Sequence, residues 1–600
     1  MSYNQNILIM KKQLLTIGSA ILLGATATSL KAQTASLQVI HNCADAAATT
    51  VDIYAGTALL IDNLQFRNAS QTFTNIPAGV NVVVGVAPGT STSSAQSLAT
   101  FTVNFANGSS NIVVADGIVS PTGYNPGNTT AGFTLNTFTT ALSAAPNATT
   151  TSVLVHHGST DAPTVDIVAP FSGANPFIPN ALVNNASYGA FAGYLNLPTA
   201  DYKIQIRDQF SENVVAEYSA PLQTLSLGGA ALTVIASGFL NPANNSNGPA
   251  FGLYVATPAG GPLLALPSST ISSTRLQAIH NCADLAAAQV DVYVQSPTSG
   301  ANAIKLIDNF AFRTASSFID VPVGETITLS IALPTSTSAV GALATFTYNL
   351  AAANKYQLIA SGLVSGSGYT PNSTVAPFNL VASAAVRERA LVSTNTDVLV
   401  FHGSTDAPVV DVQAQGAGTV VNDVAYGNYN SAGYLQLPSN TAAGDYTLHI
   451  TDATGTSTVV SYLAPLNTLG LSGNAITVLA SGFLAPANNS NGPAFGLWVA
   501  LPTGGNLIPL PTYSATSINE NNLLSTLINV YPNPFIDEVK ISNETKVNLD
   551  ITILDVMGKI ISTKKSNSDI ISINTSELPQ GIYLINVKSD DLSATYKVVK

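Results

Sequence analysis

Charged residues are scarce in this chain of 600 residues. Asp, Glu, Lys and Arg together make up 9% of the sequence, and the formal net charge is −12. A protein that binds nucleic acid needs clustered Lys and Arg to meet the phosphates, so this composition excludes nucleic acid as a partner. Hydrophobic residues make up 46% of the chain, which is enough to build the cores of several domains.

Cysteine is almost absent, since the chain has only 2. That number excludes a disulfide-stabilised scaffold. Cys43 and Cys282 occupy equivalent places in two copies of a repeat described below. We therefore expect each of them to act as a small buried hydrophobic residue.

Long hydrophobic runs are also missing, apart from a short one near the N-terminus. Lys11 and Lys12 precede an apolar run over 14–23, and small residues follow it. This pattern predicts a signal peptide over 1–32 with cleavage after Ala32, and Met10 is an alternative start. The run is shorter than the roughly 20 residues that span a membrane, so we expect no transmembrane span in the mature chain.

Catalytic signatures are lacking as well. The sequence has no HExxH, GxSxG, GxGxxG or GxxxxGK[ST] motif, which are signatures of metalloproteases, hydrolases, dinucleotide binding and phosphate binding. A nucleophile needs a base within hydrogen-bond reach, and the one hint of such a pair is Ser159 or Ser404 beside a loop histidine. We therefore predict that the protein is not an enzyme and uses no cofactor.

The middle of the chain is repetitive. LQVIHNCAD at 37–45 returns as LQAIHNCAD at 276–284, and VLVHHGSTDAP at 153–163 returns as VLVFHGSTDAP at 398–408. The two kinds of repeat, A and B, alternate along the chain as a duplicated pair. The predicted divisions are a signal peptide (1–32), module A (33–150), module B (151–267), module A′ (274–392), module B′ (393–511), a linker (512–527) and a C-terminal domain (528–600).

Each module shows the side-chain alternation of β-strands. In ATFTVNF at 99–105 the aromatic and aliphatic side chains fall on one face and the Thr and Asn side chains on the other, as in a half-buried strand. No segment shows a sustained helical period with capping residues. We predict an all-β fold, a tandem array of antiparallel, immunoglobulin-like β-sandwiches followed by a small C-terminal β-sandwich.

The B modules carry a family resemblance. HGSTDAPTVD at 157–166, YGAFAGY at 188–194 and Leu197-Pro198 resemble the domain-of-unknown-function family 4397, which occurs in secreted and surface proteins. Thr160 and Thr405 stand where that family has Pro, and the A modules depart further with Asn-Cys-Ala after His41. Because the family has no settled activity, the resemblance implies a fold and no site.

The C-terminal domain carries a second resemblance. YPNP at 531–534, a Met-Gly-Lys turn at 557–559, LPQGIY at 578–583 and KVVK at 597–600 occur in order, and this series resembles the type A sorting domain of the type IX secretion system. The resemblance implies that the secretion machinery is a partner and that the protein reaches the outer cell surface or is released. The matching sorting residues are Tyr531, Pro532, Asn533, Pro534, Gly558, Gly581 and Tyr583.

One His and two Asp recur in every module. The B-module sets are His157, Asp161 and Asp166, and His402, Asp406 and Asp411; the A-module sets are His41, Asp45 and Asp52, and His280, Asp284 and Asp291. Imidazole and carboxylate groups can bind a metal ion or a sugar, so these residues are candidate binding sites, with calcium left open as the ion. The structural alternative is that Asp caps the turn before Ala-Pro while His binds the same loop. A calcium site would ordinarily gather more carboxylates.

The Asn-rich segment PANNSNGPAFGL at 242–253, copied at 486–497, is a further candidate for glycan binding, and the alternative is a loop that leads into a core strand. We predict a secreted, non-enzymatic surface protein that binds glycans or extracellular matrix in adhesion. Two alternatives stay open at this point: a purely structural surface or stalk component, and a carbohydrate-active or other hydrolytic enzyme.

Overall fold

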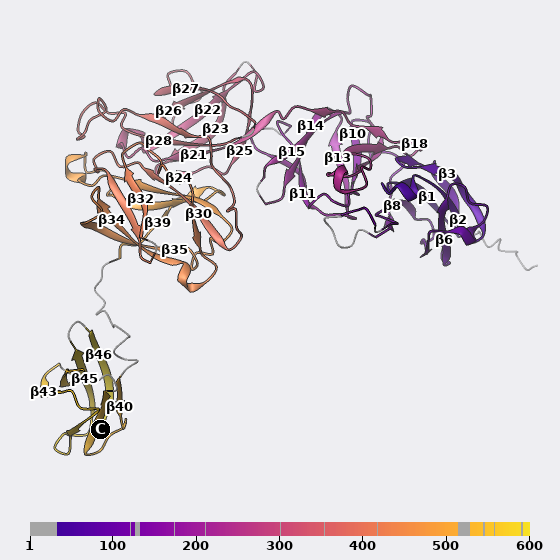
Figure 1. The fold of residues 1–600 in the computed structure, drawn as a ribbon. Coiled ribbons are helices and arrows are strands. Elements are labelled where there is room, and N and C mark those ends of the chain that lie inside the picture. Colours follow the sequence, from indigo (N-terminus) through magenta and orange to yellow (C-terminus); the bar gives the residue numbers. More distant parts are fainter. Residues whose placement is uncertain are drawn as a thin grey trace, which may run out of the picture.

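The computed structural model describes residues 33–513 and 528–600, apart from 121, 126–131, 173–174, 211, 301, 353, 417, 544–546, 557 and 590–591. The predicted signal peptide over 1–32, most of the predicted linker and Met557 lie outside the described residues. The described part is built from strands joined by turns and short 3-10 segments (Figure 1), so the all-β prediction is confirmed. No helix among these residues is long and apolar enough to cross a membrane.

Two sheets pack face to face in modules A and B. In module A the sheets are β18-β4-β1-β8-β9, with β5 on β1, and β3-β2-β6-β7. Their bounds are β1 Thr34–His41, β2 Thr50–Ala55, β3 Ala58–Gln65, β4 Asn68–Ala69, β5 Phe73–Pro77, β6 Val82–Pro88, β7 Ala99–Val103, β8 Ser110–Asp116, β9 Thr134–Phe138 and β18 Gly261–Pro262. In module B the sheets are β13-β10-β16-β17-β19 and β12-β11-β14-β15-β20. Their bounds are β10 Thr150–His157, β11 Val165–Ala169, β12 Asn180–Ala186, β13 Phe191–Pro198, β14 Asp201–Asp208, β15 Val214–Pro221, β16 Ala231–Ser237, β17 Gly252–Ala256, β19 Leu264–Ala265 and β20 Ser268–Ser269.

Modules A′ and B′ repeat this plan. Module A′ has the sheets β29-β28-β21-β24-β38, with β25 on β21, and β23-β22-β26-β27. Their bounds are β21 Ser273–His280, β22 Gln289–Gln295, β23 Ile304–Ala311, β24 Thr314–Ala315, β25 Ile319–Pro322, β26 Thr326–Ala332, β27 Ala344–Asn349, β28 Lys355–Ser361, β29 Asn379–Ser383 and β38 Gly505–Asn506. Module B′ has β33-β30-β36-β37-β39 and β32-β31-β34-β35. Their bounds are β30 Asn395–His402, β31 Val410–Ala414, β32 Gly418–Val424, β33 Leu435–Pro438, β34 Asp445–Asp452, β35 Thr458–Pro465, β36 Ala475–Ser481, β37 Gly496–Ala500 and β39 Ile508–Pro509.

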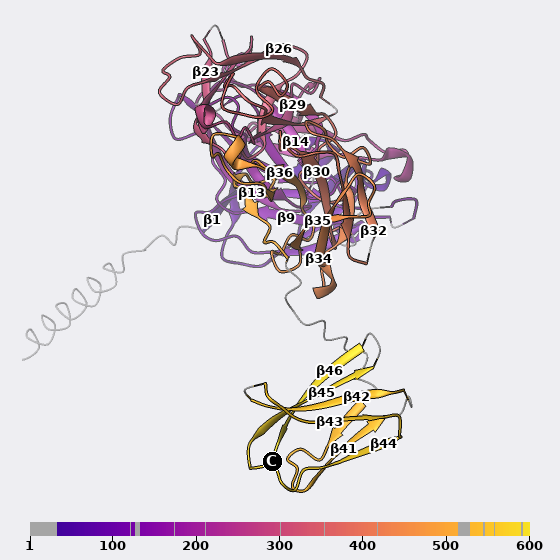
Figure 2. The same ribbon diagram turned by 90° about the vertical axis from the view of Figure 1, so that its left-hand side faces the viewer.

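The C-terminal domain is a smaller pair of sheets, β40-β41-β44 and β43-β42-β45-β46 (Figure 2). Their bounds are β40 Ile528–Tyr531, β41 Glu538–Asn543, β42 Leu549–Asp555, β43 Ile560–Ser566, β44 Ile570–Asn574, β45 Ile582–Ser589 and β46 Leu592–Val599. Ile551 and Ile553 alternate with Asp550 and Thr552 and point into the core between the sheets. This is the half-buried pattern that the sequence predicts.

One strand pair in each module is parallel, which the alternation of side chains does not reveal. The first strand of each module pairs in parallel with a strand about two thirds of the way along it: β1 with β8, β10 with β16, β21 with β28 and β30 with β36. Parallel neighbours need a long crossover connection, and here the intervening strands, most of which belong to the opposite sheet, supply it. The remaining pairs between named strands are antiparallel, as predicted.

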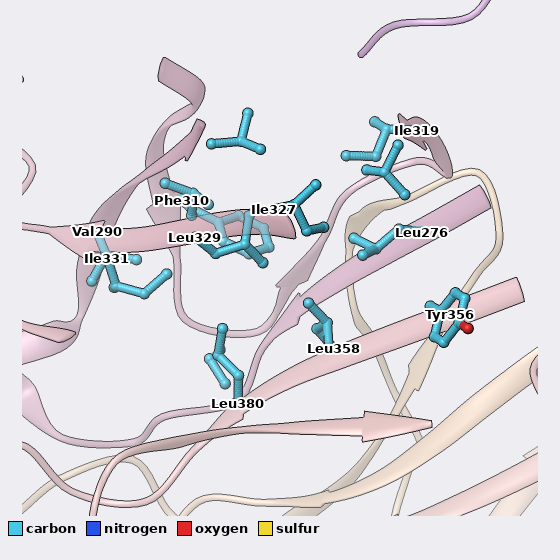
Figure 3. Packing of buried hydrophobic residues seen from close by; sticks show 14 of the residues in the cluster. Leu276, Val290, Phe310, Ile319, Ile327, Leu329, Ile331, Tyr356, Leu358 and Leu380 are labelled. Carbon is cyan, nitrogen blue, oxygen red and sulfur yellow. The ribbon is translucent and has the colours of Figure 1, made fainter. Parts of the chain in front are cut away.

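The core of module A′ lies between its two sheets (Figure 3). Leu276 and Leu358 come from one sheet, Val290 and Ile327 come from the other, and all four side chains are buried. Cys282 belongs to the same core, and Cys43 holds the equivalent place in module A. Both cysteines are free and buried, and burial raises the pKa of each thiol to about 12. They act as the small buried residues that the sequence predicts.

Each A module is joined to the B module that follows it by a short strand and an arginine. Strand β18 of module B extends the first sheet of module A by pairing with β4, and β38 pairs with β24 in the same way. Arg67 donates to Ser237 Oγ at 3.0 Å and lies 3.9 Å from the centre of the Tyr254 ring. Arg313 repeats these contacts with Ser481, at 3.0 Å, and Trp498, at 4.0 Å. The A–B and A′–B′ pairs therefore share one mode of packing.

A different contact joins module B to module A′. Arg207 on β14 donates to both carboxylate oxygens of Asp320 on β25 at 2.9 Å, and both side chains are fully buried. Gln205 donates to Ser273 Oγ at 2.9 Å. Phe177, from the segment before β12, is buried in the core of module A′, and its carbonyl accepts from Asp320 N at 2.9 Å. These residues, which we call the B–A′ clamp, connect the two pairs of modules.

We expect Arg207→Ala to destabilise the B–A′ unit by about 3–5 kcal/mol, because it removes the only close partner of the buried Asp320 carboxylate among the described residues and leaves Arg275, which lies 3.6 Å away and already pairs with Glu388. Urea denaturation followed by tyrosine and tryptophan fluorescence measures this change. Lys565→Ala is the matched control, since the Lys565–Asp550 pair on the C-terminal domain is exposed and should contribute little. Equal effects of the two substitutions would contradict a buried clamp.

Candidate functional site

The sorting-motif residues of the C-terminal domain meet at the last strand. Asn533 Nδ2 donates to Lys597 O at 3.0 Å, and its Oδ1 accepts from Val599 N at 2.9 Å. The YPNP segment therefore binds the backbone of β46 from the side. The peptide bonds Tyr531-Pro532 and Asn533-Pro534 are both cis, and Tyr531 is half exposed.

The LPQGIY segment contacts the same end of the chain. Gly581 and Lys600 exchange backbone hydrogen bonds, with Lys600 N to Gly581 O at 2.9 Å. The Lys600 ammonium group donates to the carbonyls of Thr575 and Ser576. Tyr583 is buried beside Phe535, and its hydroxyl donates to Pro579 O at 2.8 Å. Three sequence signatures that are far apart in the chain thus form one cluster.

Gly558 lies apart from this cluster. It sits in the turn between β42 and β43 with a φ of +79°, a conformation that glycine adopts without steric cost. Its amide donates to Asp555 O at 3.0 Å. Its role in the domain is to close this turn.

The repeated histidines bind backbone carbonyls within their own loops. The Nε2 distances are 2.6 Å for His41 to Ala48 O, 3.1 Å for His157 to Pro163 O, 2.8 Å for His280 to Ala287 O and 3.0 Å for His402 to Pro408 O. Burial lowers the pKa of His41 and of His280 to about 4, and it lowers the pKa of His157 and His402 as well. The rings are therefore neutral at pH 7.

The first Asp of each set receives backbone amides from a distant loop. Asp161 accepts from Leu240 N and Asn241 N, both at 2.7 Å, and Asp406 accepts from Leu484 N and Ala485 N, both at 2.8 Å. In the A modules the corresponding Asp45 and Asp284 accept from the amides of 119–120 and 364–365. Each carboxylate therefore joins the His loop to the segment that follows the parallel strand.

The second Asp of each set stabilises a left-handed residue on the neighbouring strand. Its carboxylate accepts from the backbone amide of a residue with positive φ, and the four pairs are Asp52 with Asn63, Asp166 with Asn185, Asp291 with Asn309 and Asp411 with Asp423. L-residues rarely adopt this conformation, so the bond compensates for local strain.

Among the described residues no group of three or more His, Cys, Asp or Glu side chains is placed to hold a metal ion. Ligand binding at the His and Asp residues stays a prediction, while their hydrogen bonds give them a structural role.

The Asn-rich segments lie at the contact between an A module and the next B module. Asn245 is fully buried, donates to Asp161, and accepts from Asn125 N at 3.0 Å in module A. Ser246 Oγ donates to Gly123 O at 2.8 Å. Asn489 and Ser490 make the same contacts with 368–370 of module A′. Asn245 and Ser246 and their copies are thus used in joining modules, whereas Asn244 and Asn247 of the same segment are exposed.

Two buried polar contacts between modules were not predicted. His156 Nε2 lies 2.6 Å from Asp116 across the A–B contact, and Arg207 pairs with Asp320 in the B–A′ clamp. The signal in the sequence is the difference between the copies: Ser361 and Phe401 replace Asp116 and His156, and Thr451 replaces Arg207. At these three positions the charged or ionisable residue of one copy makes a contact between modules that its neutral counterpart in the other copy does not make.

We expect stability to fall as the pH drops from about 6.5 to 4. His41 binds a proton near pH 6.5 when unfolded but only near pH 4 when folded, so in this window the unfolded chain holds more protons and acid favours it. The shift corresponds to about 3 kcal/mol for His41, and His280 adds an effect of the same sign. Urea midpoints of wild type and His41→Gln at pH 7 and pH 4 measure it. The variant should lose less stability on acidification, and an unchanged loss would contradict a buried neutral ring.

Comparison with known proteins matches two parts of the chain to family models. Residues 35–168 match the domain of unknown function DUF4397, and residues 529–600 match the secretion system C-terminal sorting domain. An endo-acting ulvan lyase from Formosa agariphila is 33% identical over 82 residues, which are 14% of this chain and 16% of that protein. The chain therefore covers less than a fifth of this curated relative.

Two solved structures show only remote likeness. The TIE protein of Bacillus anthracis is 10% identical over 78% of this chain and 68% of its own, with a TM-score of 0.11. PorZ, a bacterial surface component of the type IX secretion system of Porphyromonas gingivalis, is 10% identical over 92% of this chain and 73% of its own, with a TM-score of 0.13. Likeness at this level carries no conclusion about this chain.

The two families that match are the two that the motifs predicted, although the DUF4397 match covers module A and the start of module B, whereas the motifs placed the resemblance most strongly in the B modules. The cluster formed by YPNP, LPQGIY and the terminal lysine lies within the matched sorting domain. A sorting domain of this kind directs its protein through type IX secretion to the cell surface or the extracellular space. The chain therefore carries a DUF4397 domain at 35–168 and a type IX secretion sorting domain at 529–600, and it is a protein of the cell surface or extracellular space.

Proposed function

We propose that the exported chain is a non-enzymatic adhesion protein that binds glycans or extracellular matrix through repeated surfaces. The observation that carries this proposal is the duplicated contact between modules. The A–B and A′–B′ pairs are held by equivalent contacts of Arg67 and Arg313, and the B–A′ clamp joins the two pairs. A surface present on both pairs is therefore displayed twice on one chain, which raises the effective concentration of a second binding event.

The hydrogen bonds of the loop serines support a non-enzymatic role. Ser159 Oγ donates to Gly238 O at 2.7 Å, and Ser404 Oγ donates to Gly482 O at 2.6 Å. The neighbouring histidines direct Nε2 at the carbonyls of Pro163 and Pro408. A catalytic serine needs a base that takes its proton, and in both copies the serine and the histidine face carbonyl oxygens instead.

The B–A′ clamp also favours a second candidate, a structural spacer at the cell surface. A buried Arg207–Asp320 pair and an inserted Phe177 would hold the modules in a fixed spatial arrangement without any ligand. The two candidates differ in one measurable property, which is whether the array binds another molecule.

A binding screen of the mature protein against glycan and matrix-protein arrays distinguishes them. We expect binding that strengthens on densely coated surfaces, because two equivalent surfaces then engage together. We also expect binding to survive EDTA, since Asp161 and Asp406 are occupied by backbone amides. The control is a folded Asp161→Asn/Asp406→Asn variant. Loss of binding in that variant would make the loops ligand sites, and failure to bind any surface would contradict adhesion and favour the spacer.

Export tests the sorting domain separately. Deletion of 531–600 should retain the protein inside the cell envelope, and Asn533→Ala should reduce export because it removes both bonds to β46. Immunoblots of the medium, the cell surface and the periplasm measure this distribution. Lys565→Ala on the same domain is the control and should leave export unchanged. Surface display of the deletion variant would contradict the assignment of the sorting signal.

A further inference from the structure

Module B contains a large apolar cavity between its two sheets. Its volume is about 790 Å³, and its walls come from both sheets, with Val155 and Leu253 on one side and Ile167 and Ile204 on the other. The lining is almost entirely Val, Leu, Ile, Ala and Pro, and it includes no Asp, Glu, Lys or Arg. Cavities of about 300–1,000 Å³ are the usual size of small-molecule sites.

The equivalent space in module B′ is nearly closed, at about 40 Å³. Most of the lining is the same in the two modules, as with Val155 and Val400 or Leu253 and Leu497. Val424 and Val460 replace Ala186 and Ala216 of module B, but two such replacements fill only a small part of the difference. The size of these two side chains alone therefore does not account for the cavity of module B.

Each sheet of module B contacts a different neighbouring module. Its β10-containing sheet contacts module A, through His156 with Asp116 and through the β4–β18 pairing of the adjoining segment. Its β14-containing sheet contacts module A′ through Arg207 and Gln205. Figure 1 shows module B between these two modules. Each sheet is thus held by a different neighbour.

Module B′ lacks the residues for the second contact. Thr451 and His449 stand where module B has Arg207 and Gln205, and His449 Nδ1 bonds only within its own sheet, 2.8 Å from Ser461 Oγ. The sandwich core of module B′ packs around Val412, Leu448 and Ile476. The duplicated module therefore serves as an internal control for the open one.

We propose that the cavity of module B binds the aliphatic chain of a single-chain amphiphile such as a fatty acid, with the polar head in water. An apolar cavity of this size is poorly suited to water, which needs polar partners, and apolar molecules enter such cavities. Val215, Leu225 and Leu264 line the cavity and are 51–60% exposed, so the cavity reaches the surface. A charged head group would find no partner on the wall and stays outside.

The aliphatic walls select the chemistry of the ligand. Aromatic side chains on the wall are confined to Phe251, Tyr202 and the loop histidines, so the wall offers little stacking surface for an aromatic ligand. The His157 ring already forms a hydrogen bond with Pro163 O. A flexible methylene chain fits between two sheets of Val, Leu and Ile without needing a polar contact. This site is independent of the proposed adhesion surfaces.

Calorimetric titration of the mature protein with alkanoates of 8 to 12 carbons, below their micelle concentrations, tests the proposal. We expect one chain bound per protein, because the equivalent space in module B′ is nearly closed, and a Kd that falls about fourfold for each added methylene. Binding that does not depend on chain length, or no binding up to the solubility of the longest chain, would overturn the proposal and show that the sheets close in solution as in module B′.

Residues exchanged between the two modules supply matched variants. Ala186→Val/Ala216→Val places the B′ residues in module B, where the same fold tolerates them, and we expect at least a tenfold weaker Kd for the 12-carbon chain. Val424→Ala/Val460→Ala in module B′ is the control and should leave the Kd and the stoichiometry of one unchanged. Thermal melts verify folding, and Ala216→Val alone serves if the double variant unfolds. Equal weakening by both variants, or two chains per wild-type protein, would contradict the assignment to module B.

Discussion

The buried pair of Arg207 and Asp320 is the contact on which the arrangement of the whole array depends. The chain has few charged residues, yet it places this pair where two modules meet and excludes water from both side chains. A buried ion pair costs desolvation and is stable only with good geometry, which the two 2.9 Å bonds from one guanidinium nitrogen supply. Within module A′ the Asp320 carboxylate has only the more distant Arg275, at 3.6 Å, so the closer pairing with Arg207 favours the arrangement in which module B meets module A′.

The duplicated modules show which contacts the array requires. Asp116 and His156 occur together in the first pair and are replaced together by Ser361 and Phe401 in the second, where Phe401 lies 5.0 Å from the Tyr429 ring. Replacement of His156 alone would leave the buried Asp116 carboxylate with the amides of Asn42 and Asn136 as its remaining side-chain donors. The Arg67 and Arg313 contacts are kept in both copies. The pairing of A with B is therefore the same in both copies. The polar residues that connect B to A′ occur in module B, which an A-type module follows, and are replaced in module B′.

The strands and the repeats could be predicted from the sequence, because alternation of side chains and internal identity are local properties. The sorting motif identified Asn533 as an important residue. Its partners at 597–599 on the last strand could not be identified without the fold. The parallel strand pairs, the β4–β18 pairing and the cavity depend on how distant segments and separate modules meet, and no local pattern encodes them. The His and Asp residues could be found in the sequence as repeated polar positions. Only the structure shows that their side chains hydrogen-bond to backbone carbonyls and amides.

The most direct test of the account is the distance between modules B and A′ in solution. Spin labels on cysteines introduced at Asn184 and Val340, both exposed, can be measured by double electron–electron resonance, since the native Cys43 and Cys282 are buried. A clamped array predicts one narrow distance distribution that broadens in Arg207→Ala. A broad distribution in the wild-type protein would show that the modules move independently and would contradict the account.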